Sequence, residues 1–431
     1  MIAQGKSIAF HTFGCKLNFS ETSHIMRLVA EKGFRVTDFR DLADYYVIHS
    51  CVVTEIAEKK CRALIRSVKK RAPQSKIAIM GCYSELKKEE LEASPEIDFV
   101  LGTFDKYNLP DLIAASQEKE NIVLNARIED PLQFVPTFSS GDRTRVFLKV
   151  QDGCDYFCTF CAIPYARGRS RSNTIEKTLK TARKAIETGA KEIILTGVNV
   201  GDFGKHHGEN FFQLIQALDA ISWDGRIRLS SIEPELLSDD IIEFVAVSKH
   251  FMPHFHIPLQ SGSDKILKKM HRRYSRALFE HRVDKIKSLL PYACIAVDVI
   301  TGFPTESEKD FQDSCNFLSR LDISALHVFT YSQRNGTPAA KMEEQVPMYE
   351  RRMRSKALQR LSNEKKAFFT KNNIGRFEKV LFEAERSKGF MYGFTKNYIR
   401  VATKFDRSMI NKEIEIKLEK LNDGNEFIYN P

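Results

Sequence analysis

The sequence predicts an α/β protein in three folded parts: an open parallel α/β domain, a central partial (β/α)6 barrel and a small C-terminal β-barrel. Short apolar runs alternate with helical patterns over most of the 431 residues, which is typical of βα repeats around parallel sheets. About five short β-like segments then end the chain, and so few short strands favour closure into a small barrel. A chain of this length also exceeds one compact core.

The same patterns divide the chain into five segments. We expect an N-terminal α/β domain at 1–118, a linker at 119–143, the partial barrel at 144–341, a basic connecting helix at 342–375 and the β-barrel at 376–431. The linker is indicated by turn-forming residues, namely Asp130-Pro131, Val135-Pro136 and Ser139-Ser140-Gly141-Asp142.

Three cysteines of the first domain each come just after a predicted strand. The strands are Ser7–Phe13, Tyr45–Ser50 and Lys76–Met80, and the cysteines that follow them are Cys15, Cys51 and Cys82 (the sheet-edge triad). Because the carboxyl ends of parallel strands share one edge of a sheet, we expect these thiols to converge. Three thiolates without a fourth indicate an iron–sulfur cluster with one open iron. Burial as core residues at strand ends is the alternative.

A second set of cysteines lies within eight residues in the middle of the chain. Cys154, Cys158 and Cys161 (the loop triad) are spaced by four and three positions, and the next cysteine, Cys294, is distant. Such a loop can bind three irons of a cubane cluster, so it either borrows a distant thiol or leaves one iron open to a small molecule. A zinc site usually needs two C-x2-C pairs or nearby histidines, and disulfides need an oxidising compartment.

Six strand-like runs alternate with helical patterns after the linker. The strands are expected at Arg145–Val150, Glu192–Leu195, Ile227–Ser230, His254–Pro258, Ile295–Ile300 and Ala325–Phe329. The main helices are expected at Thr174–Thr188, Phe211–Ile221, Ser238–Val247, Tyr274–Leu289 and Glu308–Leu321. A full eightfold barrel takes about 250 residues, and these repeats span only about 185, so a partial barrel is predicted.

Functional groups of such barrels lie at the carboxyl ends of the strands, where the loop triad is also expected. Gly197, Gly262 and Gly302 would let a ligand approach the backbone closely at three of these ends. Asn199, Gln260 and Ser261 offer hydrogen bonds to a polar ligand. Each of these residues is equally compatible with ordinary turn chemistry.

Positive charge is concentrated at the C-terminal end. Of the formal net charge of +10, residues 351–431 contribute 19 basic against 10 acidic side chains. This asymmetry indicates a polyanionic partner, with nucleic acid as the first candidate. Aromatic residues alternate with basic ones there. The aromatic rings could stack on the bases of a nucleic acid, or they could equally form a core while the basic side chains face solvent. These residues are Phe390, Tyr392, Phe394 and Tyr398 with Lys388, Lys396 and Arg400.

The sequence favours a cytoplasmic protein without a membrane segment. The N-terminus lacks a long apolar signal region, and no uninterrupted apolar run approaches the roughly 20 residues of a spanning helix. Nine cysteines at irregular spacing indicate reduced thiols. We interpret Cys61, Cys294 and Cys315, which lie inside helical or strand patterns, as structural.

Taken together, these motifs resemble the radical-SAM methylthiotransferase family over nearly the whole chain. The resemblance rests on Thr12-Phe13-Gly14-Cys15-Lys16-Leu17-Asn18 with Cys51 and Cys82, on the loop triad between Val150-Gln151-Asp152-Gly153 and Ala162-Ile163-Pro164, and on the basic β-rich tail. It implies two [4Fe-4S] clusters, bound by the two triads, and S-adenosylmethionine (SAM) at the open iron of the loop triad. It also implies a TRAM-like RNA-binding tail. The aromatic Tyr156 and Phe157 inside the loop fit a cofactor-binding role in this family.

The branch of the family determines the substrate. Gly14-Cys15-Lys16-Leu17-Asn18 and Ser231-Ile232-Glu233-Pro234 are similar to enzymes that act on N6-threonylcarbamoyladenosine at tRNA position 37. The branch that modifies isopentenyladenosine tends to carry Gln-Met at positions 16 and 17, and the branch that modifies a ribosomal protein carries Pro-Lys. The alternatives are the same chemistry on one of those two substrates, or a non-catalytic iron–sulfur protein that binds RNA.

The resemblance also implies the reaction and its partners. The cluster on the loop triad would cleave SAM to a 5′-deoxyadenosyl radical, and the cluster on the sheet-edge triad would supply sulfur methylated by a second SAM. A methylthio group would then replace the hydrogen at adenine C2. The expected partners are a tRNA anticodon stem-loop, an electron donor of the flavodoxin or ferredoxin type and a sulfur source, and the protein is expected to be a monomer.

Overall fold

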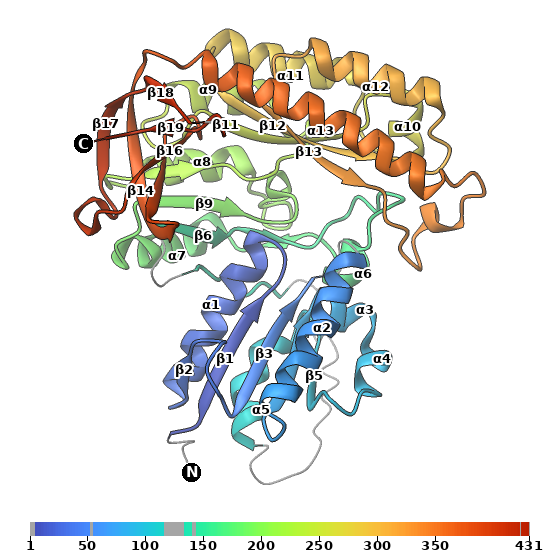
Figure 1. Cartoon of the computed structure of the whole chain (residues 1–431), viewed down its shortest axis with the longest axis vertical. Coiled ribbons are helices and arrows are strands. Elements are labelled where there is room, and N and C mark those ends of the chain that lie inside the picture. Colours follow the sequence, from blue (N-terminus) through green and yellow to red (C-terminus); the bar gives the residue numbers. More distant parts are fainter. Residues whose placement is uncertain (1–4, 52–54, 116–132, 140–143, 423, 431) are drawn as a thin grey trace.

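The computed structural model describes residues 5–51, 55–115, 133–139, 144–422 and 424–430. Figure 1 shows the N-terminal domain in blue beneath the barrel, which runs from green to orange, with the red C-terminal strands against one side. The predicted α/β fold class is confirmed. The predicted linker 119–143 lies outside the described residues except for 133–139. In that short stretch Thr137 shares a hydrogen bond with Ser20 and Phe138 forms a bridge with Leu148.

The N-terminal sheet is parallel throughout, with strand order β2-β1-β3-β4-β5. Its strands are β1 Ser7–Thr12, β2 Arg35–Thr37, β3 Tyr45–Ser50, β4 Lys76–Gly81 and β5 Phe99–Leu101. The helices are α1 Lys16–Glu31, α2 Glu55–Arg71, α3 Cys82–Leu86, α4 Lys88–Glu92, η1 Asp105–Asn108 and α5 Leu109–Ala115. Every residue of β3 is buried, as expected for a central strand covered on both faces. The three predicted strands are confirmed, while β2 and β5 are too short to produce a periodic signal.

Six parallel strands form the partial barrel, as predicted. They are β6 Arg145–Lys149, β9 Glu192–Thr196, β10 Arg226–Arg228, β11 His254–Gln260, β12 Cys294–Thr301 and β13 Ala325–Thr330. β6, β9 and β10 pair in one ladder and β11, β12 and β13 in another, and bridges from Ile227 to Phe251 and from Ser231 to His256 connect the two. In the described residues no pairing joins β6 to β13, so the barrel is open there.

Helices cover the outside of the barrel, and short elements surround its loops. The outer helices are α7 Ile175–Glu187, α8 Phe211–Asp219, α9 Asp239–Val247, α11 Arg276–Leu289 and α12 Glu308–Arg320. The short elements are β7 Gln151–Asp152, β8 Arg171–Ser172, α6 Ile163–Arg167, η2 Val200–Asp202, α10 Asp264–Lys269 and η3 Pro338–Lys341. One apolar core joins the strands to these helices.

The N-terminal domain covers the open side of the barrel. Helix α1 packs against β6, one edge strand. Near the other edge, Glu58 of α2 forms an ion pair with Arg334, which follows β13. The N-terminal domain therefore contacts one edge strand, β6, and the loop that follows the other, β13.

Helix α13 (Met348–Lys371) runs along β13 and carries the chain to the C-terminal sheet (Figure 1). A Cβ on Gly302, which follows β12, would lie 2.3 Å from Arg351 Cγ of this helix. The expectation that Gly302 leaves space for a ligand is therefore wrong, because the Arg351 side chain occupies that space. Among the described residues, no helix combines the length and the apolar character needed to cross a membrane.

The C-terminal strands form one curled sheet in the order β17-β14-β15-β16-β19-β18. Their bounds are β14 Phe377–Ser387, β15 Phe390–Phe394, β16 Arg400–Lys404, β17 Glu413–Lys417, β18 Lys420–Leu421 and β19 Phe427–Ile428, with η4 Arg407–Met409 between β16 and β17. The strands enclose an apolar cluster that includes Val380, Phe382 and Val401. The outer strands β17 and β18 do not pair within the described residues, so the sheet is a half-barrel rather than a closed one.

Two of the aromatic residues that could have stacked on RNA lie in a domain interface instead. The Phe394 and Tyr398 rings stack with their centroids 4.8 Å apart. Arg145 of β6 covers Phe394 at 4.6 Å, donates a hydrogen bond to the Tyr398 hydroxyl at 2.9 Å and pairs with Glu383 at 2.5 Å. The Phe390 ring, in contrast, is 39% exposed.

A buried ionic cluster joins the N-terminal domain to the barrel. Its members are at most 3% exposed: Glu21, Lys106, Lys149, Asp152, Arg167 and Arg171. Glu21 of α1 accepts hydrogen bonds from Lys106 Nζ at 2.6 Å and Lys149 Nζ at 2.9 Å, and from Arg167 Nη2 at 3.1 Å. Asp152 pairs with Lys149 at 2.7 Å, Arg167 at 2.9 Å and Arg171 at 3.0 Å.

Both carboxyls of the buried ionic cluster are held in the charged form. Burial by itself would raise the pKa of Glu21, but Arg167, Lys106 and Lys149 outweigh burial and lower it well below its ordinary value of 4.5. The pKa of Asp152 is lowered in the same way. Because both folded-state pKa values are depressed, the stabilisation is present above about pH 4.5 and is lost as the pH falls below it.

We expect Glu21→Gln to destabilise the protein by about 3–5 kcal/mol, because it removes one partner of three buried cations. The measurement is equilibrium unfolding in urea at pH 7 and pH 4. The wild-type protein should lose stability between these two pH values, and the variant should lose less. Glu280→Gln, which removes a partner of Arg320 on the surface, is the matched control and should change stability by less than about 1 kcal/mol. Equal effects of the two substitutions would contradict the assignment.

Candidate active site

The loop triad lies between β7 and α6, at the carboxyl end of β6. Its backbone is held by the Cys154 N–H, which donates to Gly168 O at 3.1 Å, and by the Thr159 N–H, which donates to Met270 O at 3.2 Å. Phe157 adopts a left-handed φ of 48°, which turns the loop sharply between the first two cysteines. Three cysteines are thereby brought onto one short turn, as the spacing predicted.

Gln151 connects this loop to the carboxyl end of β9. Its side-chain oxygen accepts hydrogen bonds from the backbone N–H groups of Val198 at 2.9 Å and Asn199 at 2.8 Å. Its amide nitrogen donates to Gly153 O at 2.7 Å. A Cβ on Gly197 would lie 2.9 Å from the Gln151 oxygen. The close approach expected at Gly197 is therefore made by the Gln151 side chain and not by a ligand.

Two thiols of the loop triad, those of Cys154 and Cys161, lie in an environment that disfavours free thiolates. Burial raises the pKa of Cys154 to about 12, and burial with the neighbouring Cys158 raises that of Cys161 to about 12. Arg272 Nη1 donates to Cys158 Sγ at 3.2 Å, and the Tyr156 N–H donates to Cys154 Sγ at 3.5 Å. Thiolates in such a site are stabilised when they bind a metal, so the donor set fits an iron–sulfur cluster.

Unpaired polar atoms lie beside the loop triad. Asn199 is 3% exposed, yet neither its side-chain oxygen nor its nitrogen has a hydrogen-bond partner among the described residues. Both carboxylate oxygens of Glu235 and one of Asp202 are also buried without a hydrogen-bond partner among the described residues. Burial raises the pKa of Tyr156, and the nearby carboxyls of Glu235 and Asp202 raise it further. Buried polar atoms normally have partners, so this group fits the amino, carboxylate and ribose groups of SAM.

The remaining predicted cofactor residues differ in their positions. The Tyr156 ring is 8% exposed beneath the Arg273 guanidinium at 4.0 Å, whereas Phe157 packs edge-on against Tyr165 at 5.7 Å. Gln260 has a left-handed φ of 66° at the end of β11 and lines a cavity with Cys161. The Ser261 hydroxyl is fully buried and accepts from the Ser263 N–H at 3.2 Å, so its first role is in the turn that starts α10.

The sheet-edge triad converges as its strand positions predicted. A Cβ on Gly14 would lie 3.0 Å from Cys51 Sγ, which places Cys51 beside the residue that precedes Cys15. Cys82 begins α3 at the end of β4, and burial together with the Cys15 thiol raises its pKa. Asn18 holds this edge together, because its amide donates to Phe13 O at 2.9 Å and Ser50 O at 3.2 Å.

An excess of buried positive charge adjoins the sheet-edge triad. The buried ionic cluster contains four cations and two carboxylates. Burial would lower the pKa of the Arg167 guanidinium, but the nearby Cys82, Glu21, Asp152 and Cys15 raise it well above its ordinary value. Arg167 also donates to Asn18 Oδ1 at 2.7 Å. Buried cations need anionic partners, so three thiolates carrying an iron–sulfur cluster fit this environment.

The two triads face each other across the interface between the N-terminal domain and the barrel. Helix α3, which begins at Cys82, packs against α6, which begins two residues after Cys161, and the Cys82 thiol contributes to the raised pKa of Cys161. Cys161 also lines a cavity of about 240 Å³ that extends into the barrel past Gln260, Asp298 and Arg334. A substrate in this cavity would contact groups bound to the loop triad and lie next to the sheet-edge triad.

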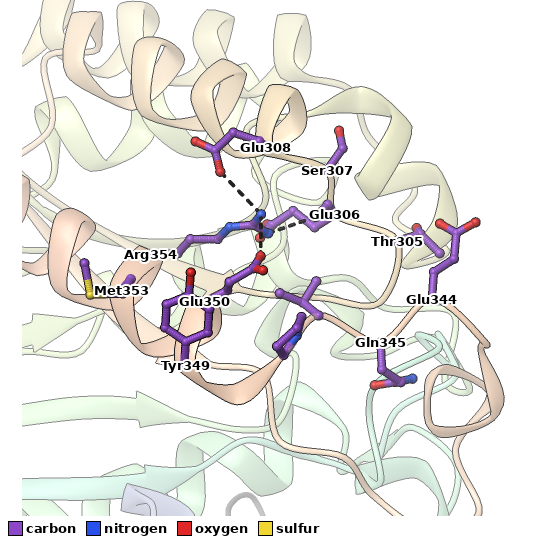
Figure 2. Close-up of a pocket in the computed structure, with 12 residues that line it drawn as sticks. Thr305, Glu306, Ser307, Glu308, Glu344, Gln345, Tyr349, Glu350, Met353 and Arg354 are labelled. Carbon is purple, nitrogen blue, oxygen red and sulfur yellow. Dashed lines mark hydrogen bonds and ion pairs between the residues drawn. The ribbon is translucent and has the colours of Figure 1, made fainter.

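A larger cavity of about 680 Å³ lies away from both triads. Figure 2 shows its lining, in which Glu306, Glu308 and Glu350 surround the Arg354 guanidinium. These contacts fasten α13 to the loop after β12. Its lining contains none of the predicted site residues, so we do not assign it to the reaction.

Several site residues could not be predicted from the sequence. Gln151 and Arg167 position the segments that carry the cysteines, because they form hydrogen bonds with Val198 and Asn18, which are distant in the chain. Arg272 donates directly to Cys158 and forms an ion pair with Glu233. The stretch from Arg167 to Arg171 is rich in arginine, but the sequence does not show that Arg167 and Arg171 are buried in the domain interface while Arg169 is exposed.

Comparisons with known proteins agree with this geometry. The model of the radical SAM superfamily matches residues 148–318, and that of Uncharacterized protein family UPF0004 matches residues 7–102. A threonylcarbamoyladenosine tRNA methylthiotransferase from Bacillus subtilis is 38% identical over 96% of this chain and 94% of its own length. The chain belongs to the radical-SAM methylthiotransferase family.

Other members of this family are similarly close. The Thermotoga maritima threonylcarbamoyladenosine tRNA methylthiotransferase is 36% identical over 92% of this chain and 91% of its own. A Clostridium botulinum tRNA-2-methylthio-N(6)-dimethylallyladenosine synthase is 33% identical over 95% and 94%. This methylthiotransferase is therefore similar to family members whose names refer to two different nucleosides.

Solved structures support the fold alone. The radical SAM methyltransferase TsrM from Kitasatospora setae matches with a TM-score of 0.57 at 11% identity, over 78% of this chain and 75% of its own. The cobalamin-dependent radical enzyme OxsB matches with a TM-score of 0.51 at 12% identity, over 86% and 56%. The family membership confirms the predicted enzyme class with SAM and [4Fe-4S] clusters as cofactors.

We expect Cys82→Ala to lose about half of the iron that the wild-type protein binds after anaerobic reconstitution, because it removes a ligand of one of two clusters. Cys61→Ala is the matched control, since Cys61 is fully buried in the α2 core and lies in neither triad. The measurement is iron and sulfide analysis with visible absorption spectra. Full iron content in the Cys82 variant, or equal loss in the Cys61 variant, would contradict the assignment.

Proposed function

We propose that the protein transfers a methylthio group to C2 of N6-threonylcarbamoyladenosine at position 37 of tRNA. The observation that carries the proposal is the meeting of two cysteine triads at one interface, beside a cavity that enters the barrel. A reaction that needs both a radical and a sulfur atom requires two such centres within reach of one substrate. The two relatives named for this nucleoside, at 36% and 38% identity over nearly the full length, support the choice of substrate.

The residues of this chain would bind and position the reacting groups. Cys154, Cys158 and Cys161 would hold the cluster that binds SAM, and Cys15, Cys51 and Cys82 would hold the second cluster. When bound, the two clusters and SAM supply the radical chemistry and the sulfur. Asn199, Asp202 and Glu235 would bind the polar groups of SAM. The buried ionic cluster would hold the two triads in a fixed relative position and exclude water from the space between them.

The proposal includes partners and a location. Residues 376–431 would act as a TRAM-like domain that binds the anticodon stem-loop, because their exposed basic side chains suit phosphate contacts. An electron donor of the flavodoxin or ferredoxin type and a sulfur source would be needed for turnover. We also propose a cytoplasmic location, because the proposed substrate is a tRNA, and a monomeric protein.

The two triads should give different phenotypes. Cys154→Ala should abolish SAM cleavage, whereas Cys51→Ala should keep SAM cleavage and yield no methylthiolated RNA, because each removes a different centre. 5′-Deoxyadenosine is measured by chromatography and the tRNA nucleosides by mass spectrometry. Cys315→Ala on α12 is the control and should resemble the wild-type protein. The same phenotype from Cys154→Ala and Cys51→Ala would contradict the assignment of two separate sites.

The tip of the β14–β15 hairpin is the proposed RNA contact. Lys388 and Lys404 are exposed there, and Phe390 pairs with Lys404 across β15 and β16. The double variant Lys388→Glu with Lys404→Glu should weaken tRNA binding about tenfold and reduce the salt dependence, because two phosphate contacts are lost. Fluorescence anisotropy at several salt concentrations measures both effects. Lys309→Glu on α12, also exposed, is the control, and an equal effect from it would refute the contact.

A deletion of 376–431 would be a poor test of RNA binding. Arg226 donates to Phe394 O at 2.9 Å and Lys379 O at 2.7 Å, and Arg228 donates to Lys396 O at 2.9 Å. Both arginines are buried between the barrel and the C-terminal sheet. Removing the sheet would expose them and disturb the barrel itself, so point variants are the better choice.

A further inference from the structure

A third cavity, of about 610 Å³, lies at the amino-terminal ends of β11, β12 and β13. It is bounded by the barrel, α13 and the C-terminal sheet, and its inner lining includes Lys16, Arg228, His254, His256, His327 and Tyr398. Asp298 marks the border between this cavity and the smaller one beside Cys161. It lines the smaller cavity and accepts hydrogen bonds from His256 at 2.6 Å and His327 at 3.0 Å, which line the larger one.

Lys16 reaches this cavity from the N-terminal domain. It follows Cys15 of the sheet-edge triad directly, and its partly buried side chain lines the cavity inside the barrel. Arg145, Arg228, Glu192 and Asp298 are the charged residues that act on its ammonium. A residue next to a proposed cluster ligand therefore lines a cavity inside the barrel, across Asp298 from the cavity beside Cys161.

The acidic neighbours of Lys16 are already engaged elsewhere. Glu192 forms an ion pair with Arg228 at 2.7 Å, and Asp298 accepts from the two histidines. Within the part of the chain that the structure describes, no carboxylate lies within ion-pairing distance of the Lys16 ammonium. A partly buried cation without a partner is costly, so the cavity favours an anionic ligand.

A second unpaired group lines the same cavity. His254 is 5% exposed, and its Nδ1 has no hydrogen-bond partner among the described residues. The His254 ring lies 4.6 Å from that of Tyr398, which stacks on Phe394, so one wall of the cavity is aromatic. The cavity thus offers a cation and a free ring nitrogen beside an apolar surface, which suits a small ligand with a carboxylate and a hydroxyl group.

We propose that the Lys16 ammonium binds the carboxylate of the threonylcarbamoyl group while the adenine lies between the two triads. This inference rests on the proposed function and adds the residue that selects the substrate. The threonylcarbamoyl group carries one carboxylate and one hydroxyl, whereas an isopentenyl group carries neither. A substrate without the carboxylate would leave Lys16 desolvated and unpaired, so the site would reject it.

The test compares two anticodon stem-loops that differ only in charge. One carries N6-threonylcarbamoyladenosine at position 37, and the other carries its carboxylate methyl ester. The reconstituted full-length wild-type protein should bind the acid about tenfold or more tightly than the ester, because a charge-assisted contact is lost. Lys16→Gln should bind both equally, and Lys16→Arg should restore the preference.

Controls separate this contact from a general defect. Lys32→Gln, at the other end of α1 and paired with Asp111 on the surface, should keep the full preference of the wild-type protein. Iron content is measured for each variant, since Lys16 adjoins Cys15, and the acid–ester comparison on wild-type protein does not depend on any variant. Equal affinity of the wild-type protein for acid and ester, an undiminished preference in Lys16→Gln, or equal weakening of both RNAs in that variant would overturn the inference.

Failure of the proposed function would look different. If the wild-type protein methylthiolates a stem-loop with isopentenyladenosine and leaves the threonylcarbamoyl stem-loop unmodified, then the proposed substrate is wrong. If it modifies the threonylcarbamoyl stem-loop without preferring acid over ester, only the role of Lys16 is wrong.

Discussion

The buried ionic cluster between the N-terminal domain and the barrel is the constraint on which the rest of the structure depends. Glu21 and Asp152 come from different domains, and Arg167 pairs with both of them. Because an unpaired buried charge is costly, the two domains have one arrangement in which these groups are satisfied. That arrangement fixes the carboxyl edge of the N-terminal sheet against the mouth of the barrel. The two cysteine triads face each other as a consequence.

The same constraint shapes the space for a substrate. The barrel has six strands and is open between β6 and β13, and the N-terminal domain covers this opening. Lys16 can therefore contribute to the inside of a barrel to which it does not belong. Arg228 lines the same cavity as Lys16, and together with Arg226 it holds the C-terminal sheet against the barrel. The proposed binding of substrate, clusters and RNA would thus depend on contacts between domains and not only on single residues.

Patterns local in sequence predicted most of the fold. The six barrel strands and their helices can be predicted from the sequence, because each repeat is long enough to show hydrophobic periodicity. The two triads were visible because cysteine spacing and strand ends carry a specific signal. The edge strands β2 and β5 are not predicted, because three residues are too few to show a periodic pattern. The half-barrel was predicted as a closed barrel, because strand count does not reveal whether the outer strands pair.

Contacts between distant parts of the chain could not be predicted. The sequence does not reveal that Gln151 fills the space at Gly197, or that Arg351 fills the space at Gly302. It also gave no means to tell Phe394 and Tyr398, which lie in an interface, from Phe390, which is exposed. These distinctions depend on how domains dock, and docking here depends on buried charges whose partners lie up to 146 residues apart.

The central claim is that the two triads bind two clusters that face each other within one molecule. Pulsed electron paramagnetic resonance of the reduced, reconstituted full-length protein tests this most directly. The account predicts a through-space magnetic coupling between two [4Fe-4S] clusters that disappears when the three cysteines of either triad are replaced by alanine. Two magnetically independent signals in the wild-type protein, or a coupling that survives loss of one triad, would contradict it.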